Sequence, residues 1–223
     1  MYSAYVFDAY GTLFDVHSAV RKHADQIGPD AAALSEVWRQ KQLEFTWTRT
    51  LMGRYLDFWT LTQQALDFAF EKFPTANKSS KQALLDAYWE LDCFDEVPAV
   101  LKALKAAGKR VGILSNGSQD MLDAAVSSAG LAELVDDSIS VDRIGKFKAL
   151  PEVYQMVVDD YEMAAETISF QSSNRWDIAG AKAFGFRTIW CNRSGQPNEY
   201  LDLQPERTLG DLTGLIDANG VPV

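Results

Sequence analysis

The sequence predicts an α/β protein built on a parallel β-sheet, with helices on both faces of the sheet and a helical segment inserted into it. Short apolar runs recur along the chain with helical patterns between them, the alternation typical of parallel sheets. The first run ends abruptly at Asp8, and residues 16–92 carry helical patterns without a convincing strand. These observations favour one core with an insertion directly after its first strand.

Length and composition fit a folded, soluble protein. The chain has 223 residues, enough for one domain with a sizeable insertion or for two small domains. Apolar residues make up 47% of it and charged residues 23%, close to the average for globular proteins. With 21 basic and 31 acidic side chains, the formal net charge of -10 argues against the broad basic face that nucleic acids and anionic membranes require.

The cysteines and the apolar runs give an expectation about the compartment. Cys93 and Cys191 lie far apart and outside any CxxC motif, so neither a disulfide framework nor a zinc cluster is indicated. No apolar run approaches the roughly 18 residues of a membrane span. Residues 1–8 lack the basic start and long apolar stretch of a signal peptide. We therefore expect a cytoplasmic protein.

The apolar runs are the expected strands. Residues 2–7 combine aromatic and branched side chains and are followed by a turn around Gly11. The other expected strands are residues 110–114, 138–141, 167–170 and 186–191. Their pattern predicts a Rossmann-like parallel sheet buried between helices.

Residues that start and end helices mark the helices of the core. Pro98 and Pro151 each suit the first turn of a helix, and Ser118 suits the cap of another. Asp177 stands where it could cap a further helix, which would end near Gly185.

Residues 16–92 are expected to form a helical cap, and residues 1–15 and 93–223 the catalytic core. Aromatic side chains crowd the inserted segment. Ligands of open parallel sheets bind beyond the carboxyl ends of the strands, so an insertion directly after the first strand would roof that crevice.

Polar residues follow the expected strands and would meet at one edge of the sheet. They are Asp8 after the first strand, Lys148 after the third and, in the other two clusters, Ser115, Asn116, Ser172, Asn174 and Asp177. Taken alone, Asp8 is equally well explained as a turn residue, and an isolated Lys148 is better explained as an exposed lysine. Gathered under an aromatic roof, these groups suit a nucleophilic site for a small anion.

In order and spacing these residues resemble the four motifs of the haloacid dehalogenase superfamily. The motifs are residues 7–15 (FDAYGTLFD), residues 115–117 (SNG), Lys148 with Tyr154 six residues on, and residues 172–177 (SSNRWD). The resemblance covers nearly the whole chain, including the early cap, and points to the L-2-haloacid dehalogenase (type II) family. It implies hydrolytic dehalogenation of short L-2-haloacids to D-2-hydroxyacids, extending to haloacetates, with no cofactor.

Two positions favour the dehalogenase branch over the phosphatase branch. Phosphatases of the superfamily carry a second Asp to protonate the leaving alcohol, and this chain has Tyr10 at that position. Their first magnesium-binding acid of the fourth motif corresponds here to Ser173, which leaves Asp177 as the nearby carboxylate. A halide leaves without a proton, so both absences damage phosphoryl transfer more than dehalogenation. A phosphatase or phosphonatase-like hydrolase and a catalytically silent binding protein are the alternatives.

The resemblance assigns the steps of the reaction to particular residues. Asp8 would attack C2 of the substrate opposite the halogen, giving an aspartyl ester that water then hydrolyses. Lys148 would hold Asp8 in its negative form, and Asp177 would pair with Lys148 and activate the water. Arg39 in the cap would accept the halide. The further catalytic residues that it implies are Thr12, Ser115, Tyr154, Ser172 and Asn174.

The resemblance also implies a substrate pocket and partners. Asn116 would bind the substrate carboxylate together with Ser115, although an Asn-Gly pair can also be a plain turn. The other expected pocket residues are Tyr10, Gln40, Leu43, Phe58 and Trp176. The expected partners are the haloacid, water and halide, with a homodimer as the expected assembly.

The remaining polar residues point to no further chemistry. His17 and His23 are six residues apart and therefore do not share a helix face, so no metal site is expected. Arg187 and Arg193 are expected to be solvated.

Overall fold

The computed structural model describes residues 2–223 and contains a parallel six-stranded sheet with the order β3-β2-β1-β4-β5-β6. The strands are β1 (Ala4–Phe7), β2 (Arg110–Ser115), β3 (Asp137–Ser140), β4 (Ile168–Ser172), β5 (Arg187–Cys191) and β6 (Arg207–Leu209). The predicted α/β fold class is confirmed. β1 pairs with both β2 and β4, so the residue that follows it stands at the middle of the sheet edge.

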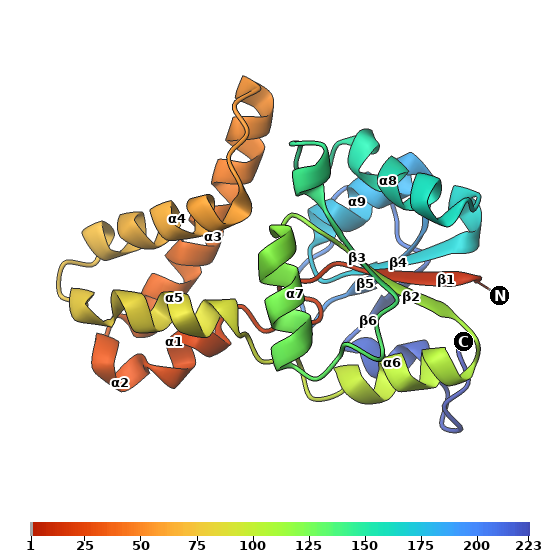
Figure 1. The fold of residues 1–223 in the computed structure, drawn as a ribbon, viewed down its shortest axis with the longest axis horizontal. Helices are drawn as coiled ribbons and strands as arrows, with labels where there is room; N and C mark the ends of the chain where they lie inside the picture. Colours follow the sequence, from red (N-terminus) through yellow and green to blue (C-terminus); the bar gives the residue numbers. More distant parts are fainter. Residues whose placement is uncertain (1) are drawn as a thin grey trace.

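The core helices cover both faces of the sheet. Figure 1 shows α6 on one side of the sheet and α8 and α9 on the other. Their bounds are α6 (Val97–Ala106), α7 (Gln119–Ser128), α8 (Pro151–Tyr161) and α9 (Arg175–Phe184). α7 packs against β3 and also contacts helix α5 of the insertion. Short 3-10 turns lie at η2 (Val141–Arg143), η3 (Ala165–Thr167) and η4 (Leu212–Leu215).

Two details of the core differ from the sequence prediction. α9 begins at Arg175, so Asp177 lies inside its first turn and the cap position belongs to Asn174. The carboxylate of Asp177 is bound by Lys148 and Tyr154 instead of by the helix end. The edge strand β6 was not expected, because Arg207–Leu209 is only three residues long and partly exposed.

Residues 16–92, all of which the structure describes, are helical and contain no β-strand. Their elements are α1 (Ser18–Lys22), α2 (Ala24–Ile27), α3 (Ala31–Met52), α4 (Phe58–Lys72), η1 (Lys78–Ser80) and α5 (Lys81–Trp89). They form a group of helices beside the sheet (Figure 1). Residue 1, the start of the expected core segment 1–15, lies outside the described residues.

The two chain segments that join the insertion to the core run side by side. The amide of Asp15 donates to the Asp92 carbonyl at 2.9 Å, and the amide of Phe94 donates to the Leu13 carbonyl at 3.0 Å. Backbone pairing of this kind holds the entry and exit of the insertion next to the loop that follows β1.

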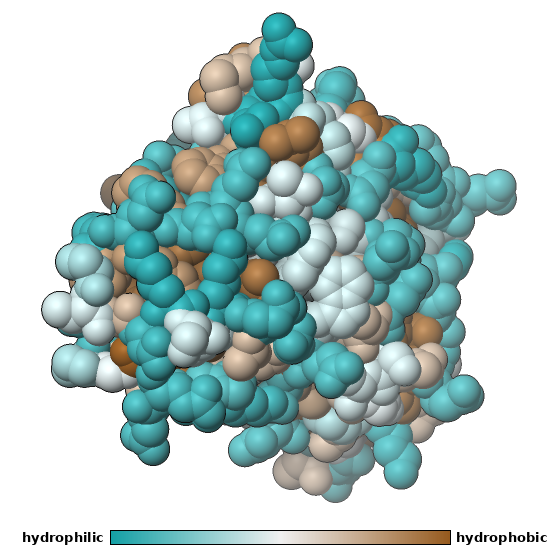
Figure 2. Space-filling model, turned by 60° about the vertical axis from the view of Figure 1, so that its left-hand side comes forward, coloured by the Kyte–Doolittle hydropathy of each residue, from teal (hydrophilic) through white to brown (hydrophobic). Residues whose placement is uncertain are grey.

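Helices α3 and α4 pack against each other as an antiparallel pair. Asp57 caps α4 by accepting from the Thr60 amide at 2.8 Å. The Trp38 indole donates to the Thr62 carbonyl at 2.9 Å, which ties the middle of the two helices together. Figure 2, in which the inserted helices come forward, shows a mostly hydrophilic surface with apolar side chains in small groups. Within residues 2–223, no helix combines the length and apolar character needed to cross a membrane.

Candidate active site

β1 delivers Asp8 to the centre of the carboxyl edge of the sheet. Its amide still donates to the Gln171 carbonyl of β4 at 2.8 Å, so its backbone is held as part of the sheet. The chain then turns at Gly11, whose φ of 95° favours glycine. A Cβ at that position would lie 3.2 Å from the Ser173 hydroxyl. The turn leaves the Asp8 side chain 8% exposed.

Four side chains hold the Asp8 carboxylate. Lys148 Nζ donates to Oδ1 at 3.0 Å. On Oδ2 the Thr12 hydroxyl donates at 3.0 Å and the Asn174 amide at 2.9 Å. The Ser172 hydroxyl lies 3.4 Å from the same oxygen. Each of these groups donates, so the arrangement occupies both oxygens of the carboxylate and fixes its orientation.

The Lys148 ammonium is shared by two buried carboxylates. Besides Asp8 it donates to Asp177 Oδ2 at 2.8 Å, and its side chain has no exposed surface. Burial alone would lower the pKa of Lys148, but the negative charges of Asp177 and Asp8 raise it above its usual value. The lysine therefore stays charged, which is the condition for pairing with either carboxylate.

Asp177 is fully buried and its other oxygen is bound by Tyr154. Burial raises the pKa of Asp177 to about 6, although the Lys148 charge acts in the opposite direction. The Tyr154 hydroxyl donates to Oδ1 at 2.8 Å. Burial, together with the charge of Asp177, raises the pKa of Tyr154 well above its ordinary value, so this phenol is a hydrogen-bond donor throughout the neutral range.

Asn116 and Ser115 lie at the end of β2, next to the Lys148 loop. Asn116 Oδ1 accepts from the Lys148 amide at 2.9 Å, and the Ser115 hydroxyl accepts from the Gly117 amide at 3.0 Å. Both side chains are buried. The amides of Gly11 and Thr12 are bonded to backbone carbonyls, so Ala9 and Tyr10 supply the loop amides best placed to face a ligand.

The insertion supplies Arg39 and an aromatic wall. Arg39 Nη2 donates to the Tyr10 carbonyl at 2.9 Å, which places the guanidinium over the loop that follows Asp8. The Tyr10 ring lies 5.7 Å from Phe58 and is stacked on Tyr88 at 5.8 Å, centre to centre. Tyr88, which is 1% exposed, was not predicted to be part of this wall, because it lies in α5 and no motif surrounds it.

Three predicted pocket residues are not fully buried. Gln40 is exposed on α3, and the buried glutamine of that helix is Gln42, which bonds Thr62 at 3.0 Å. Leu43 and Trp176 are partly buried. The assignment of all three to the substrate pocket stays a prediction.

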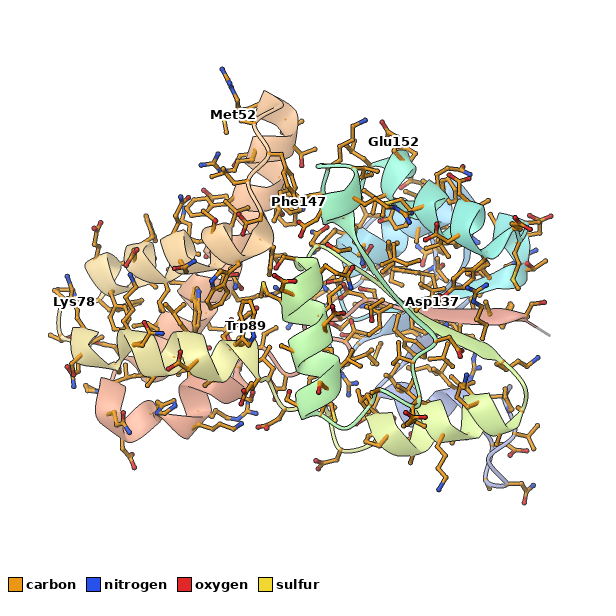
Figure 3. The ribbon with its side chains drawn as sticks, viewed as in Figure 1. Met52, Lys78, Trp89, Asp137, Phe147 and Glu152 are labelled. Carbon is orange, nitrogen blue, oxygen red and sulfur yellow. The ribbon has the colours of Figure 1, made fainter. Side chains whose placement is uncertain are left out.

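The insertion contacts the core beside both Lys148 and Asp177. The Tyr55 hydroxyl donates to Asp142, and the Tyr55 ring lies 4.9 Å from the ring of Phe147, the neighbour of Lys148. Figure 3 shows Phe147 in the core segment that faces the α3–α4 pair. On the other side, Trp47 meets Trp176 edge-on with ring centres 5.4 Å apart. The helical insertion is therefore seated over the carboxyl edge of the sheet.

The donors at this edge fit a magnesium ion poorly. Magnesium favours oxygen ligands and usually carboxylates. The carboxylates here, Asp8 and Asp177, both accept from Lys148, and the nearby Ser173 brings only a hydroxyl, which lies 3.1 Å from the Thr12 hydroxyl. Across residues 2–223 no group of three or more His, Cys, Asp or Glu side chains is arranged to hold a metal ion.

One expectation about the surroundings of the site was wrong. Arg193 is not a solvated arginine: its side chain is 17% exposed and donates to the carbonyl of Thr12 at 2.9 Å. No motif in the sequence signals this contact, because Arg193 lies in the loop after β5 and reaches Thr12 only through the fold.

Comparisons with known proteins agree with the geometry. A model of the haloacid dehalogenase-like hydrolase family matches residues 2–185. The chain is 50% identical over 213 residues to (S)-2-haloacid dehalogenase 1 of Pseudomonas sp. (strain CBS-3), with 95% of this chain and 94% of that protein covered.

Solved structures with bound reaction species are also similar. A dehalogenase crystal structure with an intermediate complex matches with a TM-score of 0.94 and 44% identity, covering 96% of this chain and 95% of that one. The L-2-haloacid dehalogenase from Xanthobacter autotrophicus with chloropropionic acid covalently bound matches with a TM-score of 0.86 and 34% identity, covering 96% and 97%. This chain therefore belongs to the haloacid dehalogenase superfamily and, within it, to the L-2-haloacid dehalogenase family.

Proposed function

We propose that this enzyme hydrolyses short L-2-haloacids to D-2-hydroxyacids through an ester on Asp8. The observation that carries the proposal is the Asp8 side chain itself, which is 8% exposed and whose carboxylate is bound by Lys148 at 3.0 Å and Thr12 at 3.0 Å. A carboxylate that is ionised, oriented and shielded from water is a competent nucleophile toward carbon.

In the first step an Asp8 oxygen attacks C2 of the substrate from the side opposite the halogen. A carbon–oxygen bond forms while the carbon–halogen bond breaks, and the halide leaves with the bonding electron pair. The configuration at C2 is inverted, so an L-haloacid gives a D-hydroxyacid. Haloacetates fit the same step because their C2 carries no further substituent.

Arg39 is the group proposed to accept the halide. It comes from the insertion and donates to the Tyr10 carbonyl, which puts its positive charge across the Asp8 loop from Lys148. Negative charge develops on the halogen only during displacement, so a cation placed there lowers the barrier more than it strengthens substrate binding. Tyr10 and Phe58 supply an apolar wall.

Ser115 and Asn116 are the groups proposed to bind the substrate carboxylate. Their own contacts hold the end of β2 and the Lys148 loop in place, with Asn116 Oδ1 bound to the Lys148 amide. The amide nitrogen of Asn116 is then the end available to a ligand, together with the backbone amides of Ala9 and Tyr10.

In the second step water attacks the carboxyl carbon of the Asp8 ester, and Asp177 accepts a proton from that water. Asp177 is suited to this role because burial raises its pKa to about 6, near the neutral range. Tyr154 and Lys148 fix its two oxygens at 2.8 Å each. The bond between the Asp8 carbonyl carbon and the ester oxygen then breaks, and the departing oxygen takes the proton from Asp177, which releases the hydroxyacid. The new Asp8 carboxyl gives up its own proton to solvent and returns to the carboxylate.

The insertion, residues 16–92, is proposed to act as the cap of this site, with residues 1–15 and 93–223 as the catalytic core. The paired linkers at Asp15 and Phe94 support these boundaries. The contacts of Tyr55 and Trp47 with the core would keep bulk water from the ester until cap opening releases the product.

We further propose that the protein is a homodimer formed through the outer part of α3 and α4. Leu51 is 87% exposed, Met52 61% and Phe68 39%. Figure 3 shows Met52 at the far end of α3, away from the sheet. A second copy would bury these side chains. Charging the surface with Leu51→Lys and Met52→Lys should convert a dimer to a monomer in sedimentation analysis.

A cytoplasmic location is also proposed. Cys93 and Cys191 are both free thiols, which suits a reducing compartment.

Halide release from L- and D-2-chloropropionate, with and without EDTA, tests the proposed activity. We expect chloride from the L-isomer only, unchanged by the chelator, and D-lactate as product. A phosphatase or phosphonatase-like hydrolase would release phosphate from its substrates and lose that activity in EDTA. A silent binding protein would release no halide from any haloacid.

A further inference from the structure

Arg193 lies where three segments meet: its own loop after β5, the return from the insertion, and residues 9–14, the nucleophile loop that follows Asp8. Its backbone follows β5, where its amide donates to the Cys191 carbonyl at 3.0 Å. The guanidinium donates from Nη2 to the Thr12 carbonyl at 2.9 Å and forms an ion pair with Glu96 at 2.6 Å. It also lies over the ring of Phe94, 3.7 Å from its centre.

Thr12, the residue that Arg193 holds, has an active-site contact on its other side. Its hydroxyl donates to Asp8 Oδ2 at 3.0 Å and accepts from the Ser173 amide at 2.8 Å. Its amide is fixed to the Ala9 carbonyl at 3.2 Å. The carbonyl contact to Arg193 is thus a further restraint on Thr12, in addition to those on its hydroxyl and its amide.

The other partners of Arg193 belong to the return from the insertion. Phe94 bonds the Leu13 carbonyl through its amide at 3.0 Å, and Glu96 lies just before α6. Nη2 of Arg193 makes both polar contacts, while the guanidinium plane lies over the Phe94 ring, a stacking that the compact ammonium of a lysine does not reproduce. Arg193 therefore ties the nucleophile loop to the segment through which the insertion re-enters the core.

We propose that Arg193 is a positioning residue for the nucleophile, acting through the Thr12 carbonyl. It does not touch the reacting atoms; it keeps the Thr12 hydroxyl on Asp8 Oδ2, and so keeps the carboxylate aimed at C2. This inference rests on the proposed function, because the affected step is ester formation on Asp8.

The first test compares Arg193→Gln with the matched control Arg187→Gln. Arg187 is a half-exposed arginine of β5 whose ion pair with Glu206 is 3.7 Å long. With L-2-chloropropionate we expect Arg193→Gln to lower kcat about tenfold, since a slightly misplaced nucleophile costs at least that much, with KM little changed. Arg187→Gln should keep wild-type kcat. Wild-type kcat in Arg193→Gln overturns the proposal.

The second test asks whether the effect passes through Thr12. In a Thr12→Val background, adding Arg193→Gln should lower kcat by less than about twofold, because the hydroxyl that Arg193 orients is already gone. A merely structural role would lower kcat by the same factor in both backgrounds, and that result contradicts the proposal. Should Arg193→Gln fold poorly, Arg193→Lys replaces it. Because an ammonium cannot stack on the Phe94 ring as the planar guanidinium does, we expect a smaller but measurable fall in kcat at unchanged KM.

A third measurement separates this inference from the proposed function. Hydrogen exchange of residues 9–14 should be faster in Arg193→Gln than in wild type and unchanged in Arg187→Gln, whatever the substrate. Lack of halide release by the wild type would defeat the proposed function alone. Unchanged exchange in residues 9–14 would defeat the role of Arg193 alone.

Discussion

Lys148 and Asp8 form an ion pair inside the protein, with Nζ 3.0 Å from Oδ1 and a lysine side chain that has no exposed surface. The same ammonium reaches Asp177 at 2.8 Å. One cation thereby pairs with both the proposed nucleophile and the group proposed to activate water. The charge of Lys148 therefore acts in both steps of the reaction.

Removing this cation should cost both activity and stability. Lys148→Met leaves two buried carboxylates unpaired, which typically destabilises a protein by about 3–5 kcal/mol. We expect halide release to be abolished and the melting temperature to fall sharply at pH 7. Lys146→Met, which removes an exposed lysine paired with Glu152, is the matched control and should leave both unchanged.

The same variant should respond to pH in a defined direction. Without Lys148 the pKa of Asp177 rises further, because burial remains and the opposing charge is gone. A carboxyl with a raised pKa in the folded state stabilises the protein at low pH, and that stability is lost as pH rises through the raised value. Thermal unfolding should therefore show Lys148→Met recovering stability, relative to wild type, between pH 7 and pH 5. A difference in unfolding temperature between wild type and Lys148→Met that stays constant from pH 7 to pH 5 would contradict the pairing of Lys148 with Asp177.

The hydrolysis step should lose rate in mild acid. Asp177 must be ionised to accept a proton, and burial raises its pKa to about 6. The Asp8 charge helps to raise this pKa and is absent from the ester, so in the ester the acidic limb lies below pH 6, and there the rate of hydrolysis should fall about tenfold per pH unit. Single-turnover decay of the ester, followed by intact-protein mass, measures this rate. Asp177→Asn should accumulate the ester at every pH, and a rate independent of pH down to 4 would remove Asp177 from the step.

Tyr154 should influence the pH profile through Asp177. Its hydroxyl donates to Asp177 Oδ1 at 2.8 Å, a contact that favours the charged form of that carboxyl. Tyr154→Phe should therefore raise the pKa of Asp177 and move the acidic limb of the activity profile to higher pH. The control is Tyr161→Phe, which alters a buried tyrosine packed beside Gly112 near the start of β2. If the acidic limb of the activity profile lies at the same pH in wild type and in Tyr154→Phe, the contact between Tyr154 and Asp177 does not influence the reaction.

Arg39 should matter most for the poorer leaving group. Losing one well-placed donor to a developing charge typically costs about a hundredfold in kcat. Arg39→Gln should therefore lower the rate with 2-chloropropionate more than with 2-bromopropionate, since chloride leaves less readily. Arg49→Gln alters an arginine farther along the same helix and should change neither rate. Equal losses for both halogens would indicate that Arg39 only binds substrate.

The strands and the sheet-edge location of the site could be predicted because they depend on local pattern. The run before Asp8 is fully buried in β1, and a buried parallel strand must be apolar along its length. β6 escaped prediction because Arg207–Leu209 pairs only with β5 at the edge and needs no apolar run. Asp177 was misplaced as a helix cap, since its partners Lys148 and Tyr154 are distant in sequence.

Contacts that depend on the third dimension were beyond the sequence. No motif surrounds Arg193, yet the fold brings its guanidinium to the carbonyl of Thr12, 181 positions earlier in the chain. Tyr88 stacks on Tyr10 because α5 returns beside the core, and its own neighbours in sequence give no sign of this. On α3 the buried glutamine is Gln42, which the sequence did not single out, while Gln40, the one that the resemblance implies for the pocket, is exposed and its role stays a prediction.

The most direct test of the account is a single turnover in water enriched in heavy oxygen, with enzyme in excess over L-2-chloropropionate. Water that attacks the ester carbonyl must leave one heavy oxygen in the Asp8 carboxylate, while the product takes its new oxygen from the enzyme. We expect peptide mass analysis to find the label in Asp8 and none in the released D-lactate. Label confined to the lactate would mean that water attacks C2 directly and that no ester forms on Asp8.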